Sequence, residues 1–403
     1  MQEIMIIGGD GFCGWPTALH LSAKGHSVTI VDNLSRRRID EDLGTNSLTP
    51  IESIDTRIKA WNEVSGNDIS FVEMNVATEY DAFEILMSEL RPDTIIHFGE
   101  QRSAPYSMKG TTEKRFTVDN NVSVTHNVLC AISTLRLNPH VIHLGTMGVY
   151  GYDDDGIEIP EGYLRVYIPG DDKQIFQRDI LYPTNPGSIY HMTKSMDQLL
   201  FQFYAKNDKL RITDLHQGIV WGTQTAETRQ DDRLINRFDY DGDFGTVLNR
   251  FLMQAATGHA LTVHGTGGQT RAFIHIQDTV NCIALAVENP QISTGKVRIM
   301  NQMTETHTVR DLANLVSRLT GAQVANVNNP RQEASENGLR VSNQSFRALG
   351  LDPVTLETGL LEETQQIAMR YADRARFDTI PCVSIWTNQQ RPGVLPEQVT
   401  VAA

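Results

Sequence analysis

Residues 4–14 have the sequence Ile-Met-Ile-Ile-Gly-Gly-Asp-Gly-Phe-Cys-Gly. The apolar run at 4–7 predicts a β-strand, and the residues after the glycines predict a helix. A strand, a tight glycine-rich turn and a helix form the first unit of a dinucleotide-binding fold. Gly8 lets the chain leave the strand sharply, Gly11 leaves room for a pyrophosphate beside the backbone, and Gly14 lets the helix lie close to the sheet. The free N–H groups at the start of that helix favour a bound phosphate.

A second apolar run, at residues 27–31, ends at Asp32, roughly 20 residues beyond Gly14. An acid at this point binds the ribose hydroxyls of adenosine and repels the 2′-phosphate that distinguishes NADP from NAD. The arginines at 36–38 oppose this interpretation, because they could hold a 2′-phosphate or simply form a solvated basic loop. We interpret Asp32 as favouring NAD.

The composition limits the classes of protein that the chain can belong to. Its 403 residues are 40% hydrophobic, which is enough for a large core, and its formal net charge of −14 argues against nucleic acid or an anionic membrane as partner. No uncharged apolar run approaches the roughly 20 residues that span a bilayer, and because the first strand begins almost at once we expect no signal peptide. The cysteines at 13, 130, 282 and 382 have no paired spacing. We therefore expect a cytoplasmic protein with reduced thiols, without membrane insertion and without a bound metal.

Strand-like and helix-like segments alternate through the first half of the chain. Strands are predicted at 69–74, 94–98 and 141–144, and helices at 80–90 and 116–135. This order predicts an α/β fold, with a Rossmann-type doubly wound parallel sheet covered by helices on both faces. Two stretches interrupt the pattern and are expected to be inserted loops, near 36–68 and 152–187.

The pattern changes after a predicted helix at 189–205 and a predicted strand at 212–215. Shorter helices and strands follow, the clearest strands lying at 261–264 and 271–276. We expect an NAD-binding Rossmann domain over residues 1–215. A smaller mixed α/β lobe over 216–403 is expected to bind the substrate and to interleave with the first domain. The tail after Arg376 is expected to be irregular.

A candidate catalytic group lies in the predicted helix at 189–205. Tyr190 and Lys194 are four residues apart and share one helix face. A lysine ammonium stabilises a phenolate, lowers the pKa of the tyrosine and lets it act as a base at neutral pH. Thr146 follows the strand at 141–144, at the sheet edge where such folds keep their chemistry. The spacing alone is common on surface helices, but with a dinucleotide motif and this threonine it indicates an active site.

These motifs together resemble the extended short-chain dehydrogenase/reductases, the family of nucleotide-sugar epimerases and dehydratases. The resemblance covers nearly all of residues 1–375. Six strings are similar to the branch of this family that makes a UDP-sugar with a sulfonate at C6; they lie at 8–15, 97–108, 144–148, 244–250, 265–271 and 329–331. The string at 97–108, His-Phe-Gly-Glu-Gln-Arg-Ser-Ala-Pro-Tyr-Ser-Met, is long and unusual, and it is the most specific of them.

The resemblance implies an enzyme that converts UDP-glucose and sulfite into a sulfonated UDP-sugar for sulfolipid synthesis. In that reaction NAD takes hydride from C4, water leaves from C5 and C6, sulfite adds at C6, and hydride returns to C4. The resemblance makes Tyr190 the base for the C4 hydroxyl, lets Thr146 share that hydrogen bond, and lets Lys194 hold the nicotinamide ribose. It also implies a homodimer formed through the helices at 116–135 and 189–205. Whether sulfite arrives free or from a donor protein stays open.

The resemblance further implies which residues bind the two ligands. Cofactor contacts are expected from Gly8, Asp10, Gly11, Phe12, Cys13, Asp32, Asn33, Arg36, Arg37, Asn75, Val76, Phe98, Gly99, Glu100, Asn120, Tyr190 and Lys194. Substrate contacts are expected from Gln101, Arg102, Thr146, Gln217, Asn249, Thr262, His264, Gln269, Arg271 and Arg331. Arg271 and Arg331 are expected at the diphosphate, because a guanidinium donates two parallel hydrogen bonds to such a group. Arg102 is a candidate for sulfite or a sugar hydroxyl, or alternatively a structural ion pair.

The chain departs from the family at three places. Ordinary sugar 4,6-dehydratases have an Asp-Glu pair directly after the threonine, whereas this chain has Met147 and Gly148. His191 is our candidate for protonating the departing C6 hydroxyl, although a lone helical histidine is more often structural. Asn75 replaces an aspartate expected near the adenine, and His216 stands where relatives often have asparagine, so its role is open.

Two other classes of function stay open. A UDP-glucose 4-epimerase or nucleotide-sugar 4,6-dehydratase needs the threonine, tyrosine, lysine and NAD but no sulfite. A non-catalytic NAD-binding sensor has no need of an activated phenol, which argues against that class.

Overall fold

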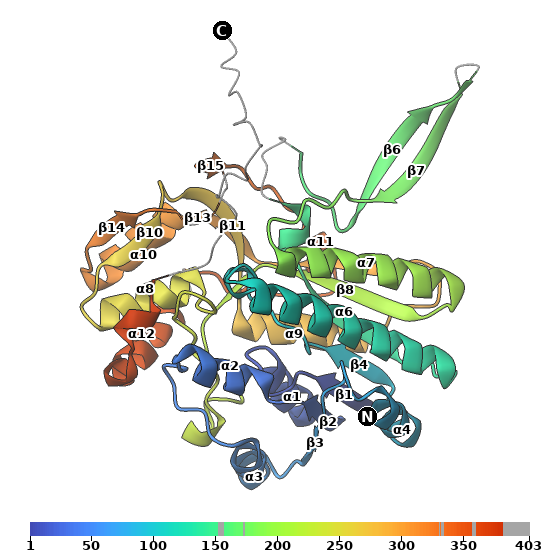
Figure 1. Ribbon diagram of the computed structural model, residues 1–403, viewed down its shortest axis with the longest axis horizontal. Helices are drawn as coiled ribbons and strands as arrows, with labels where there is room; N and C mark the ends of the chain where they lie inside the picture. Colours follow the sequence, from blue (N-terminus) through green and yellow to red (C-terminus); the bar gives the residue numbers. More distant parts are fainter. Residues whose placement is uncertain (152–156, 172–173, 330, 332–333, 357–359, 382–403) are drawn as a thin grey trace.

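A seven-stranded parallel sheet lies at the centre of the computed structural model of the chain (Figure 1). Its order is β12-β8-β5-β4-β1-β2-β3, and every neighbouring pair is parallel. The strands are β1 (Glu3–Ile7), β2 (Ser27–Asp32), β3 (Ile69–Glu73), β4 (Thr94–His97), β5 (His140–Thr146), β8 (Arg211–Gln217) and β12 (Arg298–Gln302). The structure describes residues 1–151, 157–171, 174–329, 331, 334–356 and 360–381. The predicted doubly wound α/β fold is confirmed, and the strand order reverses between β1 and β4.

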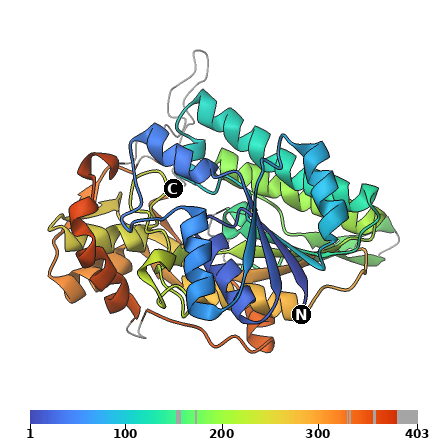
Figure 2. The same ribbon diagram turned by 90° about the horizontal axis from the view of Figure 1, so that it is seen from below.

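Helices cover both faces of the sheet (Figure 2). One face carries α1 (Gly14–Ala23), α3 (Ile54–Ser65) and α9 (Ile276–Glu288), and the other carries α4 (Tyr80–Leu90), α6 (Thr111–Thr134) and α7 (Ile189–Asn207). Successive side chains of a strand point to opposite faces. Ile4 and Ile6 therefore join the core under α1, whereas Met5 and Ile7 join the core under α6 and α7. Burial on both faces explains why these strands are almost wholly apolar.

The stretch at 36–68 is largely helical rather than an inserted loop. It contains most of α2 (Ser35–Leu43) and all of α3. The hydroxyl of Ser53 caps α3 by accepting a hydrogen bond from the N–H of Thr56, and Trp61 of α3 is fully buried. The few apolar residues of this stretch thus suffice to attach a helix to the sheet, although its overall polarity suggested a loop.

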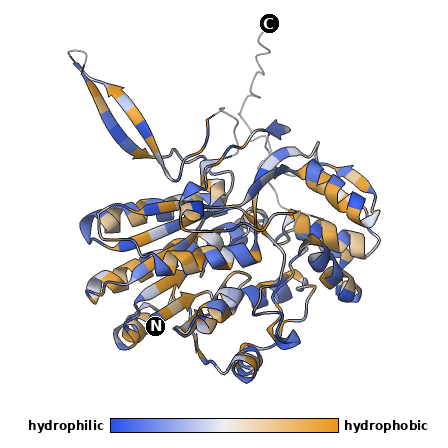
Figure 3. Ribbon diagram, turned by 180° about the vertical axis from the view of Figure 1, so that it is seen from behind, coloured by the Kyte–Doolittle hydropathy of each residue, from blue (hydrophilic) through white to orange (hydrophobic). Residues whose placement is uncertain are grey.

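The stretch at 152–187, predicted as a loop, contains an antiparallel pair of strands among its described residues. Strands β6 (Tyr163–Pro169) and β7 (Ile175–Leu181) pair from Tyr163 with Leu181 to Pro169 with Ile175. The hairpin projects from the body of the molecule (Figure 1), and its strands carry both hydrophobic and hydrophilic residues, most of them exposed (Figure 3). Strand β7 has the sequence Ile-Phe-Gln-Arg-Asp-Ile-Leu, without period-two alternation, so it lacks the usual strand signal among the surrounding Gly, Pro and Asp. Residues 152–156 and 172–173 lie outside the described part.

The second lobe packs beside the sheet around its own core, which includes Phe251 and Leu312. Its helices are α8 (Val247–Ala256), α10 (Val309–Thr320) and α12 (Leu360–Arg370). Its strands are β9 (Ile219–Trp221), β10 (Leu261–His264), β11 (Gly268–His275), β13 (Glu305–Thr308), β14 (Val324–Val327) and β15 (Glu336–Asn337). Strand β12 and helix α9 return from this half of the chain to complete the central sheet.

Short elements connect the larger ones. They are α5 (Ala104–Ser107), η1 (Met147–Tyr150), η3 (Asp232–Leu234), α11 (Gln344–Ala348), η4 (Ala372–Arg374) and η5 (Phe377–Thr379). Cys13, Cys130 and Cys282 are free thiols, while Cys382 and the tail from residue 382 onward lie outside the described residues. Within the described ranges, no helix is both long enough and apolar enough to cross a bilayer.

Candidate active site

One continuous pocket lies at the carboxyl ends of the parallel strands, where the strand order reverses. It is lined by most residues predicted for the cofactor, namely Gly8, Asp10, Gly11, Phe12, Cys13, Asp32, Asn33, Arg36, Asn75, Val76, Phe98, Gly99, Glu100, Asn120, Tyr190 and Lys194. It is also lined by Gln101, Arg102, Thr146, His191, Gln217, His264, Gln269, Arg271 and Arg331. The predicted cofactor, catalytic and substrate residues therefore meet in one space.

The glycine-rich turn has the shape that a dinucleotide requires. Gly8 has a positive φ of 81°, and a Cβ atom there would lie 2.6 Å from the carbonyl carbon of Phe98. A Cβ atom on Gly14 would lie 2.2 Å from the backbone oxygen of Gly8. Helix α1 has neither a side-chain cap nor an acid in its first turn, so its N–H groups and dipole suit an anion. The turn thus fits the pyrophosphate of NAD.

Asp32 ends β2 at the wall of the pocket. Its carboxylate accepts hydrogen bonds from the N–H groups of Asp10 (2.9 Å) and Leu34 (2.7 Å). Burial, and next the Asp10 carboxylate, raise the pKa of Asp32 to about 6. Arg36 pairs with Asp40 and Asp239, and Arg37 binds Asp10, so both arginines already have anionic partners. This arrangement favours NAD over NADP, and Arg37 does not line the pocket.

Glu100 offers a second point of fit for the cofactor. Its Oε2 atom is buried and has no hydrogen-bond partner among the described residues, although the residue lines the pocket. A buried carboxylate oxygen needs a donor, and a ribose hydroxyl is a suitable one.

Residues 234–246, here called the strap, cross the cofactor side of the pocket. The backbone oxygen of Leu234 accepts from the indole N–H of Trp15 (3.0 Å). The amide of Asn236 donates to the backbone oxygen of Phe12 (2.8 Å). Further along, Phe244 packs with Ile39 of α2 and Tyr106 of α5. The strap thereby ties the glycine-rich turn to both α2 and α5.

Asp239 attaches the strap to the neighbouring elements through ion pairs. Its carboxylate pairs with Arg36 (3.2 Å), Arg102 (2.5 Å) and Arg237 (3.1 Å). Burial raises the pKa of Asp239, but the three guanidiniums outweigh it and hold the pKa below its usual value. Arg102 is thus engaged in an ion pair at the pocket wall while it still lines the pocket, and its role toward sulfite or a sugar hydroxyl stays a prediction.

Tyr190, Lys194 and Thr146 come together as predicted from their motif. Ser188 caps α7 by accepting from the N–H of His191, and the N–H of Tyr190 donates to Ser107. Thr146 ends β5 and hydrogen-bonds the phenol of Tyr190. Burial nevertheless raises the pKa of Tyr190 to about 12, against the opposing effects of Lys194 and Thr146. The neighbouring ammonium therefore lessens the increase, whereas the sequence suggested a pKa below the usual value.

His191 occupies space that Gly148 leaves open. A Cβ atom on Gly148 would lie 2.3 Å from Nε2 of His191, so the ring fills the place of a side chain at position 148. Burial, with Arg331 and Arg271 adding to it, lowers the pKa of His191 to about 3. The imidazole is therefore neutral in the protein alone. A neutral imidazole must take up a proton before it can act as a general acid. The predicted role of His191 as the acid for the C6 hydroxyl therefore requires that it first act as a base.

The pocket wall opposite the glycine-rich turn is basic. Arg271, His264 and Gln269 come from β10 and β11, and Arg331 lies in the loop before β15. Two predicted substrate residues lie outside the lining. Asn249 accepts a hydrogen bond from the backbone N–H of Gly222 (3.1 Å). Thr262 accepts one from the side chain of Gln254 in α8 (2.8 Å). Both residues therefore make contacts within the second lobe, away from the pocket.

Sequence reasoning missed several lining residues, notably Arg237, Phe244 and Arg250. Arg250 directly follows Asn249 in the string at 244–250 that carried the resemblance, and Phe244 begins it. A helix places neighbouring residues on different faces, so the correct member of such a string cannot be chosen without the orientation of α8.

We expect NAD to stay bound through purification, because the strap covers its site and Asp32 suits the ribose diol. Denaturation followed by nucleotide analysis should release mainly NAD; mainly NADP would contradict the assignment. Asp239→Asn removes the counter-charge of three arginines, so this variant should lose NAD during gel filtration. Glu161→Gln, a substitution of a half-buried carboxylate outside the lining, is the matched control and should retain NAD.

Comparison with known proteins agrees with this geometry. Residues 4–301 match the NAD dependent epimerase/dehydratase family. The chain is 43% identical to the chloroplastic UDP-sulfoquinovose synthase of Spinacia oleracea, over 98% of this chain and 81% of that protein. It is 36% identical to the UDP-sulfoquinovose synthase of Sulfolobus acidocaldarius, over 87% and 88%.

Solved structures share the fold. A UDP-glucose 4-epimerase from Stenotrophomonas maltophila, solved with NAD and a formylated UDP-arabinopyranose, superimposes with a TM-score of 0.70 at 20% identity, covering 93% of this chain and 100% of that one. NAD is the cofactor of this protein, because the family model that matches residues 4–301 is that of NAD-dependent enzymes. The chain belongs to the NAD-dependent epimerase/dehydratase family and, within it, to the UDP-sulfoquinovose synthases.

Proposed function

We propose that this enzyme converts UDP-glucose and sulfite into UDP-sulfoquinovose, the sugar donor for sulfolipid synthesis. The observation that carries the proposal is the high identity to two UDP-sulfoquinovose synthases, over most of both chains. The pocket supports it by joining the glycine-rich turn, the Thr146–Tyr190–Lys194 group and a basic wall.

The basic wall is suited to a UDP group. Arg271 and Arg331 line the pocket together with Arg250. The charge of Arg250 contributes to the lowered pKa of His264. Guanidinium groups bind a diphosphate by charge-assisted, often bidentate hydrogen bonds. Neutralisation of Arg271 and Arg331 by a diphosphate would also remove two charges that lower the pKa of His191. Substrate binding should therefore make His191 a better proton acceptor.

Tyr190 and its neighbours act at C4. Bound NAD supplies the group that accepts hydrogen from C4 and later returns it. Tyr190 takes the proton of the C4 hydroxyl, Thr146 orients that hydroxyl through the shared hydrogen bond, and the Lys194 ammonium stabilises the phenolate. The same phenol gives the proton back when C4 is reduced.

His191 acts at C5 and C6 in this scheme. In its neutral form the imidazole takes the proton from C5, which the C4 carbonyl has made acidic, and becomes an imidazolium. The imidazolium then gives that proton to the departing C6 hydroxyl, so one residue balances the loss of water. Met147 and Gly148 leave the space for it, in place of the acid pair of other dehydratases.

The proposal predicts a specific product. Incubation with UDP-glucose and sulfite should give a nucleotide sugar with a sulfonate in place of the C6 hydroxyl and no net NADH, as measured by mass spectrometry. A sample without sulfite should not contain that mass. Conversion to UDP-galactose in both samples, without a sulfonated product, would instead favour an epimerase.

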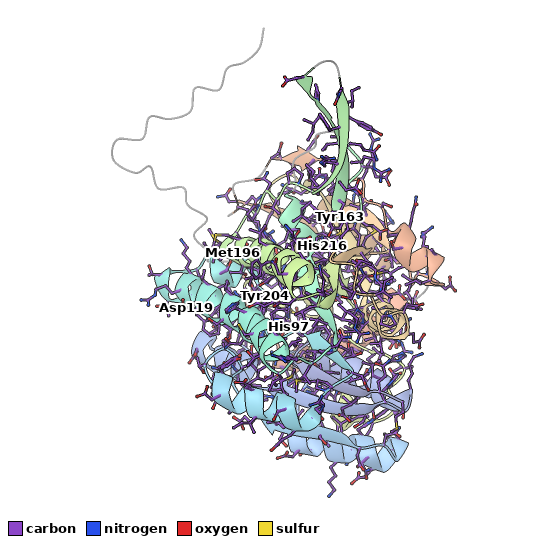
Figure 4. The ribbon with its side chains drawn as sticks, turned by 90° about the vertical axis from the view of Figure 1, so that its right-hand side faces the viewer. His97, Asp119, Tyr163, Met196, Tyr204 and His216 are labelled. Atoms are coloured by element: carbon purple, nitrogen blue, oxygen red, sulfur yellow. The ribbon has the colours of Figure 1, made fainter. Side chains whose placement is uncertain are left out.

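We also propose a homodimer formed through α6 and α7. Met196, Leu199 and Phe203 recur at helical spacing on α7 and are 36%, 65% and 58% exposed, and Figure 4 labels Met196 on this helix. Exposed apolar residues in such a row favour a protein interface. Phe203→Glu should therefore sediment as a monomer, whereas Lys206→Glu, three residues further on, should not change the assembly. A monomeric native protein would contradict the proposal.

A further inference from the structure

A row of ionisable side chains crosses the apolar sheet below the active site. His97 of β4, His143 of β5 and Asp214 of β8 are direct neighbours in the strand register, and each is at most 1% exposed. Their face of the sheet is the one covered by α6 and α7, since Ile95, Val141 and Ile212 of the same strands pack there. Buried ionisable groups in an apolar sheet are costly unless they are paired, so the row requires an explanation.

The row connects to Lys194 through Glu100, which lies just beyond β4. Nζ of Lys194 is 2.9 Å from Oε1 of Glu100, and that same oxygen is 2.9 Å from Nε2 of His143. Nδ1 of His143 is 2.8 Å from Oδ1 of Asp214. The contacts therefore run without a break from the catalytic helix to β8.

The row ends at His216, whose role the sequence left open. Nε2 of His216 is 3.0 Å from Oδ2 of Asp214, and its Nδ1 is 2.5 Å from the hydroxyl of Tyr150. Figure 4 shows His97 and His216 beside α6 and α7. A Cβ atom on Gly145 would lie 2.6 Å from Oδ1 of Asp214, so the glycine between His143 and Thr146 makes room for this pair.

The charges in the row alternate. Burial lowers the pKa of Lys194, but Glu100, Tyr190 and Asp197 outweigh it and raise the pKa. Burial raises the pKa of Glu100, but Lys194 and His143 lower it to about 2. For His143, burial and Lys194 lower the pKa, whereas Asp214 and Glu100 raise it to about 9. Lys194 and His143 are thus cations, and Glu100 and Asp214 are anions.

Two further ionisable groups, His97 and Asp197, lie beside Lys194, Glu100 and His143 and are neutral. Burial lowers the pKa of His97 on β4 to about 3, and burial raises the pKa of Asp197 on α7 well above its usual value. His97, Glu100 and His143 present ligand atoms within 4.8 Å of one another, as a metal site would. The Lys194 ammonium, however, lies 2.9 Å from Glu100 and 3.0 Å from His143, so a lysine already provides the cation there.

We propose that Glu100 is a positioning residue that keeps Lys194 charged and in place beside Tyr190, and that the His143 cation opposes Glu100 in this effect. The inference rests on the proposed function for its catalytic meaning. Glu100 is the nearest counter-ion of the buried ammonium, and His143 is a second cation on the same carboxylate oxygen. Removing each should therefore change Lys194 in opposite directions, which a merely structural role does not predict.

The first measurement needs no turnover. Cyanate carbamylates only a neutral amine, and the extent of reaction at Lys194 can be followed by peptide mass spectrometry on the NAD-bound enzyme. Loss of an opposite charge at this distance shifts a pKa by about 1–3 units. Glu100→Gln should therefore speed carbamylation of Lys194 by about 10-fold or more at a pH below the native pKa. His143→Gln should slow carbamylation of Lys194, and Glu161→Gln is the control without an effect.

The second measurement is the dependence of kcat on pH. The decline at high pH, where Lys194 loses its proton, should begin about 1–3 units lower in Glu100→Gln, and at a higher pH than in the native enzyme in His143→Gln. Equal carbamylation of Glu100→Gln and native protein would overturn the inference, as would carbamylation of His143→Gln at the native rate or faster. If Glu100→Gln does not fold, His143→Gln and the charge-retaining Glu100→Asp, expected to react like the native protein, still test it. Carbamylation as expected without a sulfonated product would reject the proposed function alone.

Discussion

Tyr190→Phe is expected to reduce turnover by about 10²–10⁴-fold, the usual contribution of a general base. The change removes one oxygen from a buried side chain and leaves its ring packing with Ala104 and Met108. Fold and bound NAD should therefore persist. Without the phenol, no group hydrogen-bonded to Thr146 can take the proton of the C4 hydroxyl.

The pKa of Tyr190 also predicts the direction in which turnover changes with pH. Because burial raises the pKa of Tyr190 to about 12, the fraction of phenolate grows with pH throughout the neutral range. Turnover of the native enzyme should rise with pH there, and the residual rate of Tyr190→Phe should lose that rise. Tyr204→Phe, on the same helix but outside the pocket lining, is the matched control and should keep native turnover. Native turnover in Tyr190→Phe would exclude the phenol as the base.

Gly148→Ala is expected to have the second-largest effect, although it adds only a methyl group. The new Cβ would lie 2.3 Å from Nε2 and 2.4 Å from Cδ2 of His191, so the ring must move. Loss of a positioned acid or base costs about 10²–10⁴-fold in rate. We expect UDP-glucose to reduce the bound cofactor, visible as NADH absorbance, while sulfonated product falls by about this factor. His191→Ala should behave in the same way.

Gly187→Ala provides the matched control for this substitution. Its Cβ would approach the same imidazole from the other side at 4.0 Å, which is an ordinary contact. Turnover should therefore stay near the native value. If Gly148→Ala lost both NADH formation and product, the ring would have a structural role; if it lost neither, His191 would not act at C5 and C6.

The sequence was sufficient to predict those features whose geometry is determined within one short segment of the chain. The glycine-rich turn, the acid that ends β2 and the i, i+4 pair of Tyr190 and Lys194 depend on backbone conformation and helix period, which neighbouring residues dictate. The parallel sheet follows equally directly, because strands buried on both faces must be continuously apolar. The string at 244–250, in contrast, predicted Asn249 at the substrate, whereas the structure places the neighbouring Arg250 in the pocket lining.

The inserted segments show why prediction stopped where it did. The helices α2 and α3 lie in a stretch whose overall polarity suggested a loop, and β7 of the hairpin lacks the period-two alternation by which a strand is recognised. Nothing local indicates that residues 234–246 cross the pocket, since their partners at Phe12 and Arg36 are roughly 200 residues away in the sequence.

The sequence alone therefore predicted the fold, the cofactor class and the candidate residues Thr146, Tyr190 and Lys194, because each was inferred from a pattern within one strand, turn or helix. The charge state of that trio depends on the folded chain. The pKa of Tyr190 follows from burial, and that of Lys194 from burial opposed by Glu100, Tyr190 and Asp197, which three different elements bring beside it. Desolvation and the distances between charges are properties of packing, and only the assembled sheet and helices determine them.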